Sequence, residues 1–249
     1  MNSGTDESVI DVQPTTRNRS LQTTNSNFPI DNLRLTNDFT ISAWIYFEEG
    51  NAINGNDVIA QGDGFSIDFQ NGFFNVSVDE LGGSIVATNT PIKSGEWAFY
   101  SVVREDGFVT LYINGNFERT SRIDDSSVQG VVTEPWTNDA VPNQLFTGLS
   151  GIIDDFRIYN SARTQTELQT ILSGDTNDSS GFIRYYSFDG SQNILTDDIG
   201  NAGDAALPNN MRFSGFLAPF VVPRVANEFS TTQVATDLEL PTDLSLIHI

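Results

Sequence analysis

The chain has 249 residues and a formal net charge of -21, with 33 Asp and Glu against 12 Lys and Arg. This excess of negative charge argues against binding nucleic acid or an anionic membrane by simple attraction. Cysteine is absent, which excludes disulfides and thiolate metal sites, and the one histidine is His248, so a histidine general base is not expected. A hydrophobic content of 38%, with 18 Phe, supports a sizeable core.

Residues 1–19 are polar and acidic, and we expect them to form an N-terminal arm. They lack the charged start and apolar stretch of a signal peptide, and no apolar run in the chain has the length of a membrane span. Either the chain is not secreted by that route, or Met1 is not the native start. A virion protein would need no signal peptide, and a fragment of a larger surface protein would also lack one.

Strand signals follow one another closely along the first two thirds of the chain. Residues 39–46 carry large side chains on both faces, as a strand in a two-sheet sandwich does. Residues 65–70 and 73–78 alternate around Asn71-Gly72, the strongest hairpin signal in the chain. Turn signals recurring about every 8–12 residues predict an all-β antiparallel sandwich.

The stretch from Gly151 to Asn160 reads as a buried strand that leads into a short helix. With regular alternation, one carboxylate falls on the face assigned to the core: Ile152, Asp154, Phe156 and Ile158. A carboxylate there needs partners, and the backbone N–H groups near Gly151 are candidates. Thr164 and Glu167 form a predicted capping box at the helix start.

The G-x-I-D-D-x-R-I-Y run at 151–159 resembles the closing strand of LamG-like jelly-roll domains, in the concanavalin A-like lectin/glucanase superfamily. Three further stretches resemble the family in its own order: 38–45, 95–103 and 109–115. The resemblance implies a two-sheet antiparallel jelly-roll sandwich over residues 20–174, with one short helix after the closing strand. One fold hosts many functions, so the function has to come from a site.

Residues 175–249 are predicted to be a linker and a C-terminal extension. The run from Gly181 to Gly190 resembles the family's opening strand, although here it follows the closing one. It either begins a second, truncated copy or folds back to complete the first sandwich. Because its aromatic side chains are costly to leave in water, we expect Phe182 to Phe188 to dock onto the first domain's sheet.

An enzymatic role is not expected, although the superfamily includes glycoside hydrolases. Their E-x-D-x-E strand, which presents two carboxylates about 5 Å apart, has no counterpart in this chain. The runs at 66–69, 77–80 and 153–155 lack the pair of glutamates. The chain is therefore predicted to be non-catalytic.

Calcium is the one cofactor that the residues suggest. Hard cations take oxygen ligands, and the superfamily's members often hold one calcium ion at the sandwich rim. The candidate ligands lie at loops or strand starts: Asp57, Asp63, Asp139 and Asp154. Two interpretations stay open, a bound ion or solvated turn and capping residues.

A sugar site is predicted in the long irregular segment from 126 to 148. Aromatic rings would stack on sugar faces, and amide and carboxylate groups would bind hydroxyls, at Trp136, Asn138, Asp139 and Phe146. In the alternative, Trp136 closes one end of the core. Trp44 and Trp97 fall on the family's core positions and are interpreted as packing residues.

Together these observations predict a non-catalytic module of a cell-surface or virion protein that recognises glycan or protein surfaces. The first alternative is a purely architectural capsid, fibre or decoration subunit that assembles with itself. The second alternative is a glycoside hydrolase of the same superfamily. The expected location is an extracellular surface or a virion.

Overall fold

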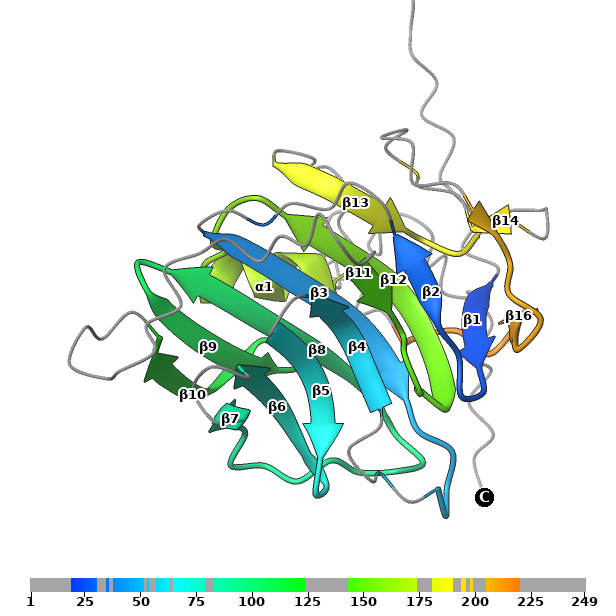
Figure 1. The fold of residues 1–249 in the computed structure, drawn as a ribbon, viewed down its shortest axis with the longest axis horizontal. Coiled ribbons are helices and arrows are strands. Elements are labelled where there is room, and N and C mark those ends of the chain that lie inside the picture. The colour runs from blue at the N-terminus through cyan, green and yellow to red at the C-terminus, as the bar shows by residue number, and fades with distance from the viewer. Residues whose placement is uncertain are drawn as a thin grey trace, which may run out of the picture.

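Two antiparallel β-sheets pack face to face in the computed structural model (Figure 1). The structure describes residues 19–30, 35, 38–51, 53, 57–62, 65–78, 83–123, 143–173, 181–189, 194–195, 198 and 205–219. With one short helix among these residues, the arrangement confirms the predicted all-β jelly-roll sandwich.

Among the described residues the larger sheet has eight strands, and β13 (Phe182–Tyr186) joins it by pairing with β12. The other seven strands run in the order β10 (Asn116–Arg122), β9 (Phe108–Ile113), β8 (Trp97–Glu105), β3 (Phe39–Tyr46), β12 (Gly151–Tyr159), β1 (Ser20–Thr23) and β16 (Met211–Ser214).

The second sheet has six strands in the part of the chain that the structure describes, and it faces the viewer in Figure 1. Its order is β2 (Phe28–Ile30), β11 (Asn143–Leu145), β4 (Asp57–Gly62), β5 (Phe65–Gln70), β6 (Phe73–Val78) and β7 (Gly83–Ala87). A separate two-stranded sheet joins β14 (Ile194–Leu195) to β15 (Ala205–Ala206).

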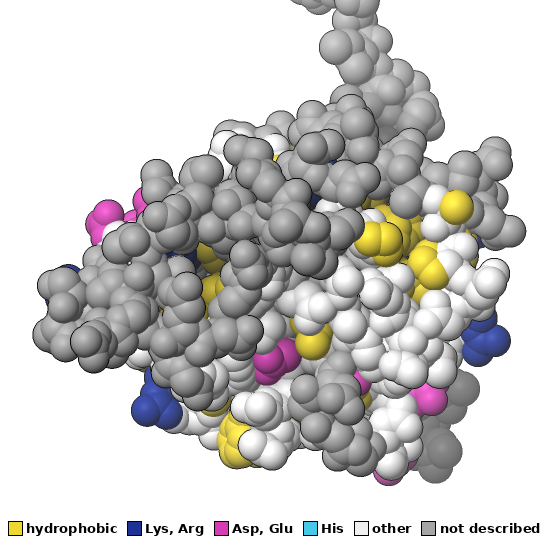
Figure 2. Space-filling view, viewed as in Figure 1, with side chains coloured by type: hydrophobic (Ala, Val, Ile, Leu, Met, Phe, Trp, Pro, Cys, Tyr) yellow, Lys and Arg dark blue, Asp and Glu magenta, His cyan; other side chains and the backbone are white. Residues whose placement is uncertain are grey.

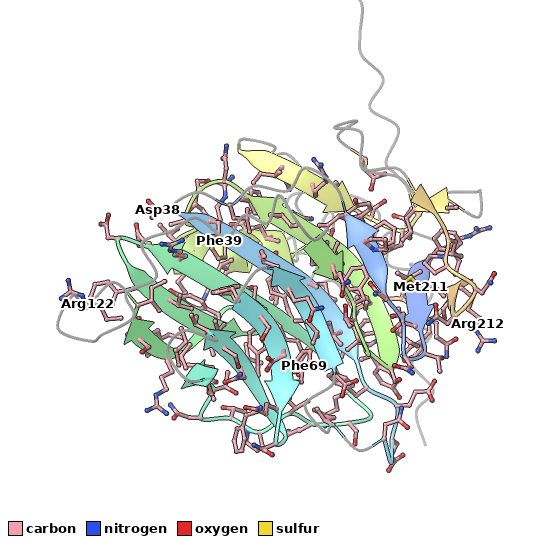
Figure 3. All side chains as sticks on the ribbon, viewed as in Figure 1. Asp38, Phe39, Phe69, Arg122, Met211 and Arg212 are labelled. Carbon is pink, nitrogen blue, oxygen red and sulfur yellow. The ribbon has the colours of Figure 1, made fainter. Side chains whose placement is uncertain are left out.

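The main core lies between the two large sheets. Alternate residues of each strand point inward, as period-2 patterning requires, and aromatic rings meet edge to face across the gap. Phe69, for example, contacts the rings of Phe47 and Tyr100 at centroid distances of 4.9 and 5.0 Å. Figure 3 labels Phe69 among the side chains that fill this space.

Tight turns set the strand register where the sequence predicted them. Asn71 and Gly72 have φ angles of 53° and 80°, and Asn114 and Gly115 have 52° and 70°. Positive φ at both central residues is the requirement of the hairpin turn that Asn-Gly favours. The predicted hairpin at Asn71-Gly72 is therefore confirmed.

A β-bulge in β12 changes which residues face the core. The register against β3 shifts between Asp154 and Arg157, and Asp155 has a φ of 52°. Ile153, not Ile152, belongs to the main core with Phe156 and Ile158. The core-facing residues predicted from the sequence were therefore wrong before the bulge and right after it. The extra residue of the bulge reverses which alternate side chains of the strand face the core.

Asp154 consequently lies on the outer face of the larger sheet, opposite Trp44 of β3. Its Oδ2 accepts a hydrogen bond of 3.1 Å from the backbone N–H of Ala218. The sequence predicted a core position for Asp154, and this is wrong because the bulge turns its side chain to the outer face. A donor 64 residues away in sequence could not be read from local pattern.

Asp155 and Arg157 form a fully buried ion pair, with 2.9 Å between Arg157 Nη2 and Asp155 Oδ2. The guanidinium lies 5.0 Å from the ring centre of Tyr185 and 6.0 Å from that of Phe182, both on β13. Burial by itself lowers the pKa of Arg157, but the charge of Asp155 and the neighbouring tyrosines raise that pKa above its ordinary value. Aromatic rings of β13, a strand of the predicted C-terminal extension, therefore cover the ion pair.

The helix α1 (Gln165–Leu172) covers part of the same outer face. Its predicted capping box is present: Thr164 Oγ1 accepts from the Glu167 N–H, and Glu167 Oε2 accepts from the Thr164 N–H at 2.7 Å. The Thr164 hydroxyl also donates to Glu167 Oε2 at 2.7 Å, and this bond, together with the one from the Thr164 N–H, lowers the pKa of Glu167. Leu168 and Ile171 are buried in the small outer cluster that includes Trp44.

The strand β13 docks on the second half of β12, with Phe156 opposite Tyr186 and Arg157 opposite Tyr185. This confirms the expectation that Phe182 to Phe188 joins the first domain's sheet. β1 pairs with the first half of β12, from Gly151 to Ile153, so β1 and β13 share one edge of that strand. The division of the chain into an arm, a domain at 20–174 and an extension stays a prediction.

Candidate functional site

The outer face of the six-stranded sheet carries the best-formed polar site among the described residues. It starts from the β5–β6 hairpin, whose turn places Asp68 opposite Asn75 and Ser66 opposite Ser77. Because side chains alternate along a strand, these four residues all point away from the core. The residues between them point inward and are buried: Ile67, Phe74 and Val76.

Hydrogen bonds join these side chains and Ser84 of β7 into one network, which we call the sheet-face cluster: Ser66, Asp68, Asn75, Ser77 and Ser84. The Asp68 carboxylate accepts from Ser66 Oγ at 2.7 Å and from Asn75 Nδ2 at 2.9 Å. Asn75 Nδ2 also donates to Ser77 Oγ at 2.7 Å. Ser84 Oγ donates to Asn75 Oδ1.

Asp68 is poorly hydrated for a carboxylate on a sheet surface, with 7% of it exposed, and Asn75 is 1% exposed. Burial raises the pKa of the Asp68 carboxyl, and the hydrogen bonds from Ser66, Asn75 and Ser77 oppose that rise. Groups whose pKa is shifted by burial within a polar cluster concentrate at functional sites. Ser66 and Ser77 are half-buried and so remain reachable from solvent.

A second pair of polar side chains extends the cluster along the same face. Gln61 of β4 lies opposite Ser66 on one side and opposite Gln144 of β11 on the other. Its Nε2 donates to Gln144 Oε1 at 2.6 Å, and Thr147 Oγ1 donates to the same oxygen at 3.2 Å. Figure 2 views the molecule from this side, where the described surface is largely uncharged, with an acidic group near its middle.

Hydroxyl, amide and carboxylate groups in one row are the donors and acceptors that bind sugar hydroxyls. Ser66, Asp68 and Gln70 alternate onto the outer face of β5, and only the middle residue carries a carboxylate. β6 carries none. Retaining glycoside hydrolysis requires two carboxylates about 5 Å apart, so this hairpin offers recognition chemistry without that pair.

Sequence reasoning missed the sheet-face cluster, although a signal for it was present. Once Asn71-Gly72 is accepted as a two-residue turn, the pairings Asp68 with Asn75 and Ser66 with Ser77 follow by counting outward from it. The polar residues on both strands then share one face.

The sugar site predicted in the segment from 126 to 148 can be placed only in part. Phe146 has no exposed surface, and its ring packs on that of Phe156 at a centroid distance of 5.1 Å. It is a core residue, so the prediction that Phe146 stacks on a sugar is wrong. Trp136, Asn138 and Asp139 lie outside the described residues.

Of the predicted metal ligands, Asp57 starts β4 and Asp154 lies in β12, in different sheets. Asp57 Oδ1 accepts a hydrogen bond of 3.1 Å from the Ser150 N–H. Asp63 and Asp139 lie outside the described residues. Within the described part of the chain, no group of three or more His, Asp or Glu residues is placed to hold a metal ion. Calcium binding stays a prediction.

Trp44 and Trp97, which were both predicted to be packing residues, lie among the described residues. Trp44 is buried in the outer cluster beneath α1, as expected. Trp97 is half-buried, stacks with Phe216 at 5.6 Å and contacts Tyr46 at 5.7 Å.

No helix among the described residues is both long and apolar enough to cross a membrane.

A family profile described as the concanavalin A-like lectin/glucanases superfamily matches residues 19–169, more than half of the chain. The chain belongs to this superfamily. Among curated proteins, none matches it.

Solved structures share the fold at low sequence identity. A protein from Bacteroides ovatus, provisionally described as carbohydrate-binding, has a TM-score of 0.63 and 17% identity. That match covers 82% of this chain, which spans 62% of the length of the Bacteroides chain. Domains LG4-5 of the mouse laminin alpha1 chain match with a TM-score of 0.41 and 10% identity, over 59% of this chain and 44% of theirs.

Proposed function

We propose that the protein is a non-catalytic, glycan-binding module that acts at an extracellular surface. The observation that carries the proposal is the sheet-face cluster, in which Asp68 is held by Ser66 and Asn75 on a face whose described surface is largely uncharged. The superfamily and the carbohydrate-binding description of the Bacteroides ovatus protein support the same ligand class.

Asp68 is the anchor of the proposed site. A sugar hydroxyl that donates to this carboxylate would form a charge-assisted hydrogen bond, which is stronger where water is scarce. Gln61, Gln144 and Ser77 would bind neighbouring hydroxyls along the sheet. Trp136 remains the proposed stacking residue, and Asn138 and Asp139 remain the proposed partners of sugar hydroxyls.

The test is a glycan array, followed by calorimetry on the ligand that binds best. Asp68→Asn keeps the shape of the side chain and removes its charge. We expect roughly a 10- to 100-fold loss of affinity, since a hydrogen bond to a charged group contributes about 1.5–3 kcal/mol. Trp136→Ala should also weaken binding. Glu105→Gln removes one charge from an exposed residue of β8 and should leave the affinity unchanged.

Two results would overturn the proposal. One is an Asp68→Asn variant that folds and binds the glycan as tightly as the parent. The other is a blank array together with self-assembly in sedimentation, which would favour an architectural capsid, fibre or decoration subunit. Glucan hydrolysis that disappears in Asp68→Asn would instead restore the glycoside hydrolase reading.

A further inference from the structure

One residue from each of the six described strands of the second sheet lies in a single row across its outer face. We call it the cross-strand row, and in the strand order from β2 to β7 it consists of Pro29, Gln144, Gln61, Ser66, Ser77 and Ser84. The strand register places each of these residues directly opposite the next. Figure 1 shows the strands side by side. Because neighbouring strands lie about 4.8 Å apart, the row is about 24 Å long.

None of the six side chains in the row is charged, although the chain carries a net charge of -21. Each of them is half-buried or exposed, so a ligand can reach it from solvent. Asp68 lies beside the middle of the row, two residues along β5 from Ser66 and on the same face. The row therefore passes through the sheet-face cluster and continues beyond it toward β2.

The serines of the row present acceptors to a ligand. Ser66 Oγ donates its hydrogen to Asp68 Oδ2 at 2.7 Å. Ser84 Oγ donates its hydrogen to Asn75 Oδ1. A hydroxyl has one hydrogen and two lone pairs, so each of these oxygens has used its donor and can still accept.

The glutamines of the row offer donors as well as acceptors. Gln144 Oε1 accepts from Gln61 Nε2 at 2.6 Å and from Thr147 Oγ1 at 3.2 Å. These bonds hold both amides in place and leave Gln144 Nε2 and Gln61 Oε1 without partners among the described residues. Side chains that are already ordered lose less entropy when a ligand binds.

This pattern of donors and acceptors matches a neutral sugar chain and not an anion. A sugar hydroxyl both donates and accepts, so it can bind at either half of the row. A carboxylate or a sulfate only accepts, so it finds no donor at Ser66 or Ser84 and is repelled by Asp68 beside them. One unit of an extended glycan advances by about one strand spacing, so about five units would cover the row.

Building on the glycan-binding role proposed above, we infer that the ligand is an extended, neutral polysaccharide that lies across the strands of the second sheet. Its central units bind at Ser66, Asp68 and Ser77. The flanking units reach Ser84 on one side and Gln144 on the other. Such a site binds along a chain and needs no chain end.

Calorimetric titration with linear β-1,4-linked oligosaccharides of glucose, mannose or xylose, from three to seven units long, measures the dependence on length. Binding of the best of these series should strengthen roughly 10-fold between three and five units, because the added units each gain a hydrogen bond at the ends of the row. It should change little beyond that length. A β-1,4-linked hexamer of glucuronic acid should bind more weakly than the neutral hexamers.

Two variants at opposite ends of the row separate long ligands from short ones. Gln144→Leu and Ser84→Ala should each weaken binding of the neutral hexamer roughly 5-fold, the loss of about one neutral hydrogen bond. Both should leave the trimer within about 2-fold, because a trimer centred beside Asp68 reaches neither end. Gln70→Leu is the matched control. It removes the same amide from the outer face of β5, four residues along the strand from Ser66, and should change the affinity for the hexamer less than about 2-fold.

The inference fails if none of the neutral oligosaccharides binds, or if trimer and hexamer bind equally well. A larger loss in Gln70→Leu than in the two end variants would also overturn it, since the chain would then lie along the strands. Tighter binding of the glucuronic acid hexamer would overturn the neutral assignment. Asp68→Asn keeps the two proposals apart. Binding that depends on Asp68 and not on chain length overturns this inference alone, whereas binding that is unchanged in Asp68→Asn overturns the proposed site.

Discussion

Replacing Arg157 with methionine tests whether the ion pair with Asp155 stabilises the closing strand. Both side chains are fully buried, so the substitution leaves the carboxylate without its cation. Removing one partner of a buried pair costs about 3–5 kcal/mol. For a chain of this size about 1 kcal/mol lowers the melting temperature by roughly 2–4 °C, so we expect a decrease of about 6–20 °C.

The assay is urea unfolding followed by tryptophan fluorescence, with calorimetry for the melting temperature. The double variant Asp155→Asn/Arg157→Met removes both charges, and Asn tolerates the left-handed φ of 52° at position 155. It should be more stable than Arg157→Met alone. Arg119→Met, on exposed β10, should stay within about 0.5 kcal/mol of the parent. An Arg157→Met variant as stable as the parent, or a double variant less stable than the single one, would refute the reasoning.

Two further predictions concern Asp68 and β13. Because burial raises the pKa of Asp68, the folded state holds that proton to higher pH than the unfolded state, and the contribution of Asp68 to the free energy of unfolding falls as pH rises above the ordinary value of 3.8. Asp68→Asn should therefore gain stability relative to the parent as pH rises from about 3 to 7 in urea unfolding, and a difference that is constant or opposite in sign would contradict this. Tyr186→Ala, which removes a ring that is 1% exposed, should destabilise the whole sandwich by about 3–5 kcal/mol in a single calorimetric transition. A separate early transition with an unchanged main one would show β13 to be an independent unit.

The architecture could be predicted because its signals are local. Asn71-Gly72 and Asn114-Gly115 fix two hairpins, and the Thr164 capping box fixes the helix start. These features depend on residues within a few positions of each other. The matches to the family's ordered motifs then supplied the topology.

The parts that the sequence did not reveal depend on one inserted residue or on distant partners. The bulge at Asp155 exchanges the two faces of β12, and nothing in the alternation around it marks the place. Phe146 looked like a loop aromatic, yet it lies in the core against Phe156. Asp154 accepts a hydrogen bond from the backbone N–H of Ala218, which is distant in sequence. The sheet-face cluster was within reach, since it requires only the register of one hairpin.

The shared edge of β12 has a consequence for synthesis on the ribosome. Residues 20–23 pair with 151–153 and with 211–214. The ribosome therefore makes β1 long before β12 and β16, the two strands that β1 pairs with. A nascent chain that ends at the helix has a closing strand whose second half still lacks β13. Such long-range pairing folds slowly and leaves strand edges open to other chains meanwhile. We therefore expect newly made chains to depend on chaperones until the residues that form β16 have emerged.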